Sequence, residues 1–182
     1  MSASSSDGWS RAQRRLHWTV AALVLAAFAI GLVMVALPLT QLLAKIIAYQ
    51  AHKSLGLLVL PLVLWRLLLR ARRGRPTPDI AIPGWQHRAA AAGHAALYAL
   101  LILVPLLGYA AASTAPGQIE TVLFLVLPVP HLLPADESLY ETIRPVHQAA
   151  AWGLVVLAAG HAAMAVLHHR RGHATLRAML GR

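Results

Sequence analysis

The sequence predicts an all-α fold, an integral membrane four-helix bundle with both termini in the cytoplasm. The chain is 58% hydrophobic and its mean hydropathy is +0.62, which is too apolar for a soluble domain of 182 residues. Several apolar runs approach the roughly 20 residues that a helix needs to cross a bilayer. The basic residues gather beside these runs, as expected for topology signals at the ends of membrane spans.

The order of apolar runs and breakers divides the chain into four spans. Pro38 ends the first run, and Pro145 suits the first turn of the last helix. The expected spans are about 16–37, 48–69, 89–112 and a run that follows Pro145. We therefore expect a cytoplasmic tail at 1–15, a four-span domain at 16–169 and a second cytoplasmic tail at 170–182.

The run TVLFLVLPVP at 121–130 is apolar but too short to cross a bilayer. Pro128 and Pro130 also interrupt it. We expect an interfacial or partly re-entrant segment rather than a fifth span.

Charge is distributed unequally between the two sides of the four-span arrangement. By the positive-inside rule, the side richer in arginine is cytoplasmic, and the composition favours a bacterial inner membrane. The net charge of +10 does not indicate nucleic-acid binding, because the basic residues flank apolar runs instead of covering a soluble surface. The basic side carries Arg11, Arg14, Arg15, Arg70, Arg72, Arg73, Arg75, Arg88, Arg170, Arg171, Arg177 and Arg182, and the other side carries Lys45, Lys53 and Arg144 with Glu120, Asp136, Glu137 and Glu141.

The sequence contains no cysteine. This excludes disulfides, thiolate metal sites, iron–sulfur clusters and the covalent attachment of a c-type haem. Any haem in this protein is held without a covalent link to the chain.

Two histidines of the last span lie on one helix face. His147 and His161 are fourteen residues apart, close to four full helical turns, so their side chains project in nearly the same direction. Along the helix axis they are separated by about 21 Å. In a hydrocarbon core of about 30 Å, one ring lies near each membrane surface.

The direction of each span matches these two histidines with others by depth. The outer level holds His52 with His147, and the inner level holds His17, His94 and His161. A single histidine near a helix end is most often an interfacial polar residue, but ionisable residues deeper in spans are costly and usually functional. The spans lack the carboxylates and thiolates that complete zinc or di-metal sites. Paired imidazoles from facing helices suit the axial ligation of haem.

Small and basic residues accompany the histidines. Lys53 and Arg66 are candidate partners of haem propionates, and the alternative is that such cations only reach toward the membrane surface. Glycines in the spans open space for a porphyrin or serve ordinary helix packing. These glycines are Gly31, Gly56, Gly93, Gly108, Gly153 and Gly160.

The motifs LHW at 16–18, HKSLG at 52–56 and GHAALY at 93–98, with the histidine pair of the last span, resemble the prokaryotic cytochrome b561 family. The resemblance extends over about 11–176 and includes the b subunits of formate dehydrogenases and nickel–iron hydrogenases. It implies two haem b groups, with His17 and His161 as iron ligands at the inner level and His52 and His147 at the outer level. His94 matches a position that is not a ligand in that pattern. It is a candidate for quinone or proton handling, or a packed core histidine.

The resemblance implies electron transfer between ubiquinone and a partner on the outer face. For the stand-alone family type, the expected reaction is oxidation of superoxide to O₂ at the periplasmic face, coupled to ubiquinone reduction. Lys53 and Arg144 would attract the superoxide anion, although the outer face is acidic as a whole. The alternative is a quinol-linked partner of a periplasmic cytochrome or oxidoreductase, which the acidic loop would suit. A third hypothesis, a structural or transport bundle without redox activity, predicts no haem absorbance.

Overall fold

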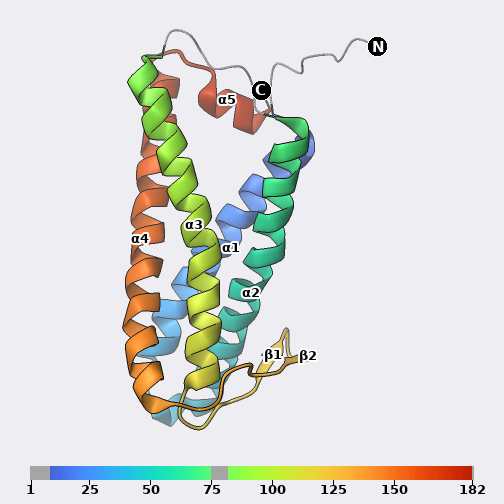
Figure 1. Cartoon of the computed structure of the whole chain (residues 1–182), viewed down its shortest axis with the longest axis vertical. Helices are drawn as coiled ribbons and strands as arrows, with labels where there is room; N and C mark the ends of the chain where they lie inside the picture. The colour runs from blue at the N-terminus through green and yellow to red at the C-terminus, as the bar shows by residue number, and fades with distance from the viewer. Residues whose placement is uncertain (1–8, 75–81, 182) are drawn as a thin grey trace.

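Four long helices form the protein, and the computed structural model describes residues 9–74 and 82–181 of the chain. The helices are α1 (Arg11–Ala36), α2 (Leu42–Arg73), α3 (Gly84–Thr114) and α4 (Glu137–Arg170), arranged as one bundle (Figure 1). Each is long and apolar enough to cross a membrane. The all-α four-helix membrane fold is therefore confirmed. The start of α1 and the short helix α5 (Thr175–Leu180) lie at the same end of the bundle (Figure 1).

The first two helices are longer than the apolar runs predicted. Ser10 and Gln13 form a capping box that starts α1 at Arg11, so the arginines expected in the polar tail belong to the helix. The helix ends at Ala36, before Pro38, as predicted. Only a 3₁₀ turn (Leu39–Gln41) separates α1 from α2, because the polar residues of the connection are accommodated in the first turns of α2.

The predicted start of the last helix after Pro145 is wrong. Helix α4 starts two turns earlier, at Glu137, where the side chain of Asp136 accepts a hydrogen bond of 2.9 Å from the Leu139 amide. A capped start with an acidic residue in the first turn is favourable because of the helix dipole. Pro145 lies inside α4 and does not begin the helix.

The apolar run after α3 folds as a small hairpin. Strands β1 (Thr121–Leu123) and β2 (Leu127–Val129) pair antiparallel, with Thr121 opposite Val129, beside the lower part of α2 (Figure 1). Phe124 and Leu125 turn the chain at positive φ angles of 51° and 61°. The side chains at this tip are apolar and exposed. A short hairpin of this kind is not a membrane span. Its exposed apolar tip is consistent with the expected interfacial segment rather than a fifth span.

The hairpin is hydrogen-bonded to α2 through two buried polar side chains. Gln50 donates to the Glu120 carbonyl at 2.7 Å and accepts from the Val122 amide at 3.1 Å. The Ser54 hydroxyl accepts from the Phe124 amide at 2.8 Å and donates to the Gln50 carbonyl at 2.7 Å. These bonds fix the turn of α2 between Gln50 and Ser54.

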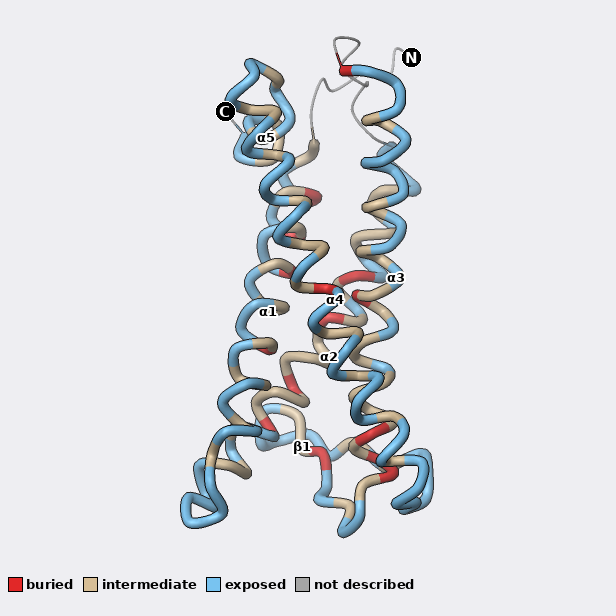
Figure 2. The backbone as a smooth tube through the Cα atoms, turned by 90° about the vertical axis from the view of Figure 1, so that its left-hand side faces the viewer, coloured by how far each residue is buried: buried red, intermediate tan, exposed pale blue. Residues whose placement is uncertain are grey.

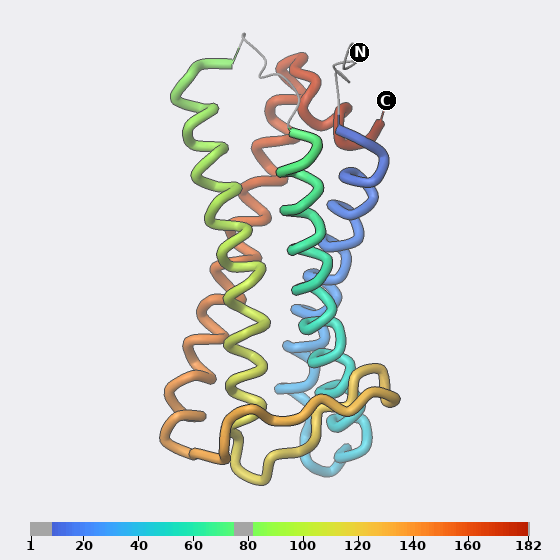
Figure 3. Tube along the Cα trace, turned by 45° about the vertical axis from the view of Figure 1, so that its right-hand side comes forward, coloured from blue at the N-terminus to red at the C-terminus, as the bar shows by residue number. Residues whose placement is uncertain are grey.

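The four helices are packed as two hairpins. Helix α1 runs along α2 and α3 runs along α4, with α2 also touching α3 (Figure 3). Helix α4 makes few close backbone contacts with α1 or α2. Figure 2 shows that buried positions are sparse along all four helices, as expected where lipid covers the outer surface. The buried apolar core consists of Leu16, Val20, Val59, Val63, Leu101 and Leu154.

Candidate bis-histidine sites

Two pairs of histidines join helices that are otherwise hardly in contact. His17 of α1 faces His161 of α4, with ring centres 6.3 Å apart. His52 of α2 faces His147 of α4 at 6.2 Å. The structure thus places opposite each other the outer pair that depth matching gave and, among the three inner histidines, the His17–His161 pair that the family resemblance implied. Helix α4 contributes one ring to each pair.

The two separations suit one metal ion between the rings of each pair. A bond from a metal ion to an imidazole nitrogen is about 2 Å long and the ring centre lies about 1 Å further back, so two opposed imidazoles on one metal have ring centres roughly 6 Å apart. No group of three or more His, Cys, Asp or Glu side chains suited to a metal ion occurs within 9–74 and 82–181. Two ligands are what an iron needs when a porphyrin already supplies the other four.

The histidines of the second pair are oriented by backbone carbonyls. Nδ1 of His52 lies 2.8 Å from the Ala27 carbonyl oxygen, and Nδ1 of His147 lies 3.0 Å from that of Val104. A carbonyl oxygen only accepts, so each Nδ1 carries the hydrogen and each neutral ring keeps its lone pair on Nε2. Metal-binding histidines are commonly held in this way, because the second bond fixes the tautomer and the ring orientation.

A glycine allows each of these rings to approach its carbonyl. A Cβ atom on Gly31 would lie 3.1 Å from Cε1 of His52, and one on Gly108 would lie 2.9 Å from Cε1 of His147. Each glycine follows the accepting carbonyl by four residues, one helical turn, on the helix that faces the histidine. These two glycines leave room for the rings of His52 and His147. A Cβ atom added to any of the other four glycines of the spans would meet nothing within 4 Å, as open space beside a large flat group requires.

The first pair has a third histidine beside it. His94 of α3 lies 5.1 Å from His161, closer than His17 does. This distance is shorter than two opposed metal bonds allow, so it describes a ring contact rather than a shared metal. Nδ1 of His17 is buried and has no hydrogen-bond partner among the described residues. A buried nitrogen of this kind is expected to have a function or an unseen partner.

The predicted cationic residues are located at different levels. Arg66 interacts electrostatically with His17 and His161, and it stacks with Arg70 on the ring of Tyr98, each guanidinium carbon 5.5 Å from the ring centre. Lys53 donates to the Ile119 carbonyl at 3.1 Å and therefore contacts the segment that leads into the hairpin. Arg66 is thus close to a histidine pair, while Lys53 is already engaged by the backbone.

An aromatic contact lies between the two histidine levels. Phe28 of α1 and Trp152 of α4 meet edge to face, with ring centres 4.8 Å apart. Trp152 follows His147 by five residues and precedes His161 by nine. Sequence reasoning did not identify this contact, because neither residue belongs to a motif.

Comparison with known proteins agrees with this geometry. The family model described as prokaryotic cytochrome b561 matches residues 8–182. Cytochrome b561 homolog 2 of Escherichia coli (strain K12) is 35% identical over 167 residues, which cover 91% of this chain and 87% of the relative. Cytochrome b561 homolog 1 of the same organism is 27% identical over 166 residues, covering 88% and 89% of the two chains.

Proposed function

Because the chain belongs to the prokaryotic cytochrome b561 family of membrane electron-transfer cytochromes, which bind haem b, we propose that it carries electrons across the bacterial inner membrane through two haem b sites. The observation that carries the proposal is that two separate pairs of histidines face each other between helices. Both use α4, and their α4 members are fourteen residues, or about 21 Å, apart along one helix. Two sites at that separation extend over most of a hydrocarbon core of about 30 Å.

The residues present fit haem b. His17 and His161 would hold the inner group, and His52 and His147 the outer group. Bound haem supplies one-electron redox chemistry, and two axial histidines favour electron transfer over oxygen binding. The carbonyls of Ala27 and Val104 hold the outer rings with Nε2 free.

Charged and polar side chains complete the two sites in this proposal. We assign Arg66 to a propionate of the inner haem because it lies near His17 and His161. We assign Lys53 to the outer haem, where two of its three N–H groups remain for a second partner beside the Ile119 carbonyl.

We propose that ubiquinone exchanges electrons at the inner level. Reduction of ubiquinone to ubiquinol takes two electrons and two protons. His94 is the residue proposed to handle protons, because it contacts His161 and an imidazole changes its protonation near neutral pH.

The proposed reaction at the outer level is superoxide oxidation. Two superoxide anions give two O₂ and two electrons, which reduce one ubiquinone together with two protons. Lys53 and Arg144 are two of the cations of the outer end, and they would attract the anion. Arg144 is paired with Glu141 at 3.2 Å, and Lys53 donates to a carbonyl, so both are partly engaged.

A second candidate is favoured by the charge of the outer end. All four carboxylates in the described residues lie there, and only one of them forms an ion pair within that part of the chain. Such a surface suits a basic periplasmic cytochrome or oxidoreductase that exchanges electrons with the quinol pool. The carboxylates are Glu120, Asp136, Glu137 and Glu141.

Two measurements test these proposals. A reduced-minus-oxidised spectrum with a haem-to-protein ratio tests the redox function, and a ratio near two is expected. Stopped-flow reduction of the oxidised protein by superoxide tests the substrate, with His147→Ala as the control that lacks the outer site. Haem reduction much slower than the diffusion limit of about 10⁸–10⁹ M⁻¹s⁻¹ contradicts the superoxide reaction and favours a protein partner.

A further inference from the structure

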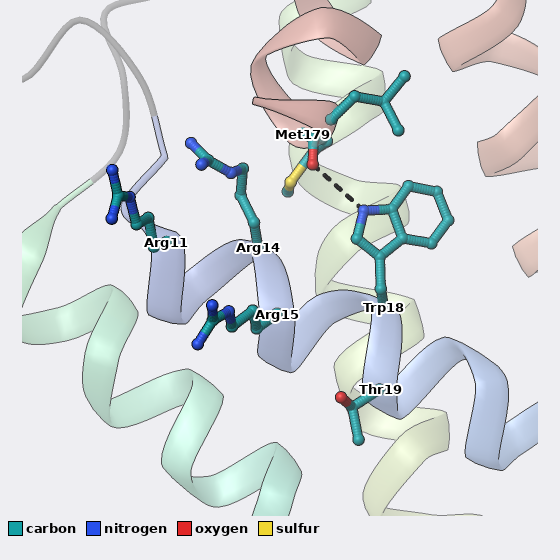
Figure 4. Close-up of a pocket in the computed structure, with 7 residues that line it drawn as sticks. Arg11, Arg14, Arg15, Trp18, Thr19 and Met179 are labelled. Atoms are coloured by element: carbon teal, nitrogen blue, oxygen red, sulfur yellow. Dashed lines mark hydrogen bonds between the residues drawn. The ribbon is translucent and has the colours of Figure 1, made fainter. Parts of the chain in front are cut away.

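A groove lies beside the first turns of α1, at the end of the bundle that carries α5 (Figure 4). Its volume is about 850 Å³, within the range of ligand pockets and much larger than a single small anion requires. Neither histidine pair contributes to it. The lining residues are Arg11, Arg14, Arg15, Trp18, Thr19, Met179 and Leu180.

One side of the groove is strongly cationic. Arg11 and Arg15 are exposed and one helical turn apart, where like charges repel each other. Arg14 adds a third guanidinium, which donates to the Trp9 carbonyl at 2.8 Å and keeps further N–H groups. The carboxylates of the described residues all lie at the opposite end of the bundle, and Asp7 and Asp79 fall outside the described ranges. The described part of the chain therefore offers these arginines no counter-ion.

The other side of the groove is apolar and is built from the C-terminal helix. The indole N–H of Trp18 donates to the Met179 carbonyl at 3.2 Å, which ties α5 to α1 (Figure 4). Trp18 and Leu180 remain 45% and 51% exposed, so the wall is accessible. Tryptophan at the end of a spanning helix is typical of the lipid–water interface.

We propose that this groove binds an anionic phospholipid. The guanidinium groups of Arg11, Arg14 and Arg15 hold the headgroup phosphate, and the first acyl-chain carbons pack against Trp18 and Leu180. A zwitterionic headgroup has no net charge to set against the three arginines. The groove therefore favours a headgroup with a net negative charge. The apolar wall distinguishes a lipid from free phosphate, because phosphate would gain nothing from it. By bridging α1 and α5, the lipid fastens the C-terminal helix to the start of the first span.

The test measures binding of short-chain lipids to the purified, haem-loaded full chain. The probes are dihexanoyl phosphatidylglycerol, dihexanoyl phosphatidylethanolamine and inorganic phosphate. We expect phosphatidylglycerol to bind at least tenfold more tightly than either other probe. If phosphatidylethanolamine binds as tightly as phosphatidylglycerol, the groove does not select for headgroup charge. If phosphate binds as tightly as phosphatidylglycerol, the groove is a simple anion site. Either result overturns the proposal.

Matched variants locate the site. The double change Arg11→Gln with Arg15→Gln is expected to weaken phosphatidylglycerol binding at least tenfold. Arg72→Gln with Arg73→Gln removes the same charge from the nearby end of α2, outside the groove, and is expected to change binding less than twofold. Equal losses in both variants would mean that net charge alone attracts the lipid, which contradicts a specific groove.

A third variant tests the apolar wall. Leu180→Ser is expected to weaken lipid binding severalfold and leave phosphate binding unchanged, and equal lipid affinity would contradict contact with the acyl chain. An unchanged haem spectrum shows that a variant is folded. If the double arginine variant loses its haem, the comparison of the three probes on the unaltered protein decides the proposal.

Discussion

A Cβ atom on Gly108 would lie 2.9 Å from Cε1 of His147, so this position of α3 has room only for a hydrogen atom. A Cβ atom on Gly31 would lie 3.1 Å from Cε1 of His52, a tight contact with slightly more room. In both cases the ring bonds through Nδ1 to the carbonyl four residues before the glycine. Each of these two histidines is therefore held by the neighbouring helix of its own hairpin, and the lone pair of its Nε2 remains available to a metal ion.

Gly108→Ala is expected to weaken haem binding at the outer site. The added methyl group forces the His147 ring away from the Val104 carbonyl, and overpacking of this kind costs about 1–3 kcal/mol. That is roughly a 5- to 150-fold loss of haem affinity. The measurement is a titration of the haem-free protein with haem, followed by absorbance. The affinity of the outer site is compared between Gly108→Ala and the unaltered protein.

Gly84→Ala is the control for this change. It adds the same methyl group to the same helix, at a position with nothing within 4 Å. Haem affinity in Gly84→Ala should match that of the unaltered protein. Equal affinity in Gly108→Ala would contradict the close packing of glycine against the ligand ring.

Single histidine changes on α4 should separate the two sites. His147→Ala is expected to lose only the outer haem and His161→Ala only the inner one, because each ring belongs to a different pair. The haem-to-protein ratio should fall by about half in each variant, with different spectral components remaining. Loss of both haems from either variant would contradict independent sites.

His94→Gln tests the third histidine of the inner level. Because its ring is 5.1 Å from His161, too close for opposed metal bonds, both haems are expected to remain. If His94 handles protons for the quinone, the rate of haem oxidation by a ubiquinone analogue should fall, by about 10²- to 10⁴-fold for a lost general acid. The loss of a haem would instead assign His94 to the ligand set in place of His17.

Helix geometry and span direction predicted part of the histidine arrangement. His147 and His161 share a face whatever the neighbouring helices do, and the span directions match His147 with His52. They placed His17 and His94 both at the level of His161, and the choice of His17 came from the family resemblance. The carbonyls of Ala27 and Val104 were not predictable, because any residue supplies a carbonyl and only packing selects one. Gly31 and Gly108 were identified as glycines of interest, but their close approach to the rings of His52 and His147 depends on how the helices meet.

Predictions of helix ends were less accurate, since hydropathy marks the apolar part of a helix and not its polar turns. The starts of α1 at Arg11 and of α4 at Glu137 depend on the capping residues Ser10 and Asp136. The hairpin after α3 depends on Gln50 and Ser54, which lie about 70 residues earlier in the chain. Contacts at such a separation leave no local pattern in the sequence.

Ser54→Ala is expected to loosen the hairpin without removing a metal ligand. Ser54 is 2% exposed and its hydroxyl accepts from the Phe124 amide, so loss of the hydroxyl leaves a part-buried N–H unsatisfied at a cost of about 1–3 kcal/mol. Hydrogen–deuterium exchange of the Phe124 amide should accelerate by roughly 5- to 150-fold. Thr142→Ala serves as the control, because it removes an exposed hydroxyl that bonds only within α4. Unchanged exchange at Phe124 would show that Gln50 alone holds β1 against the turn of α2 that carries His52.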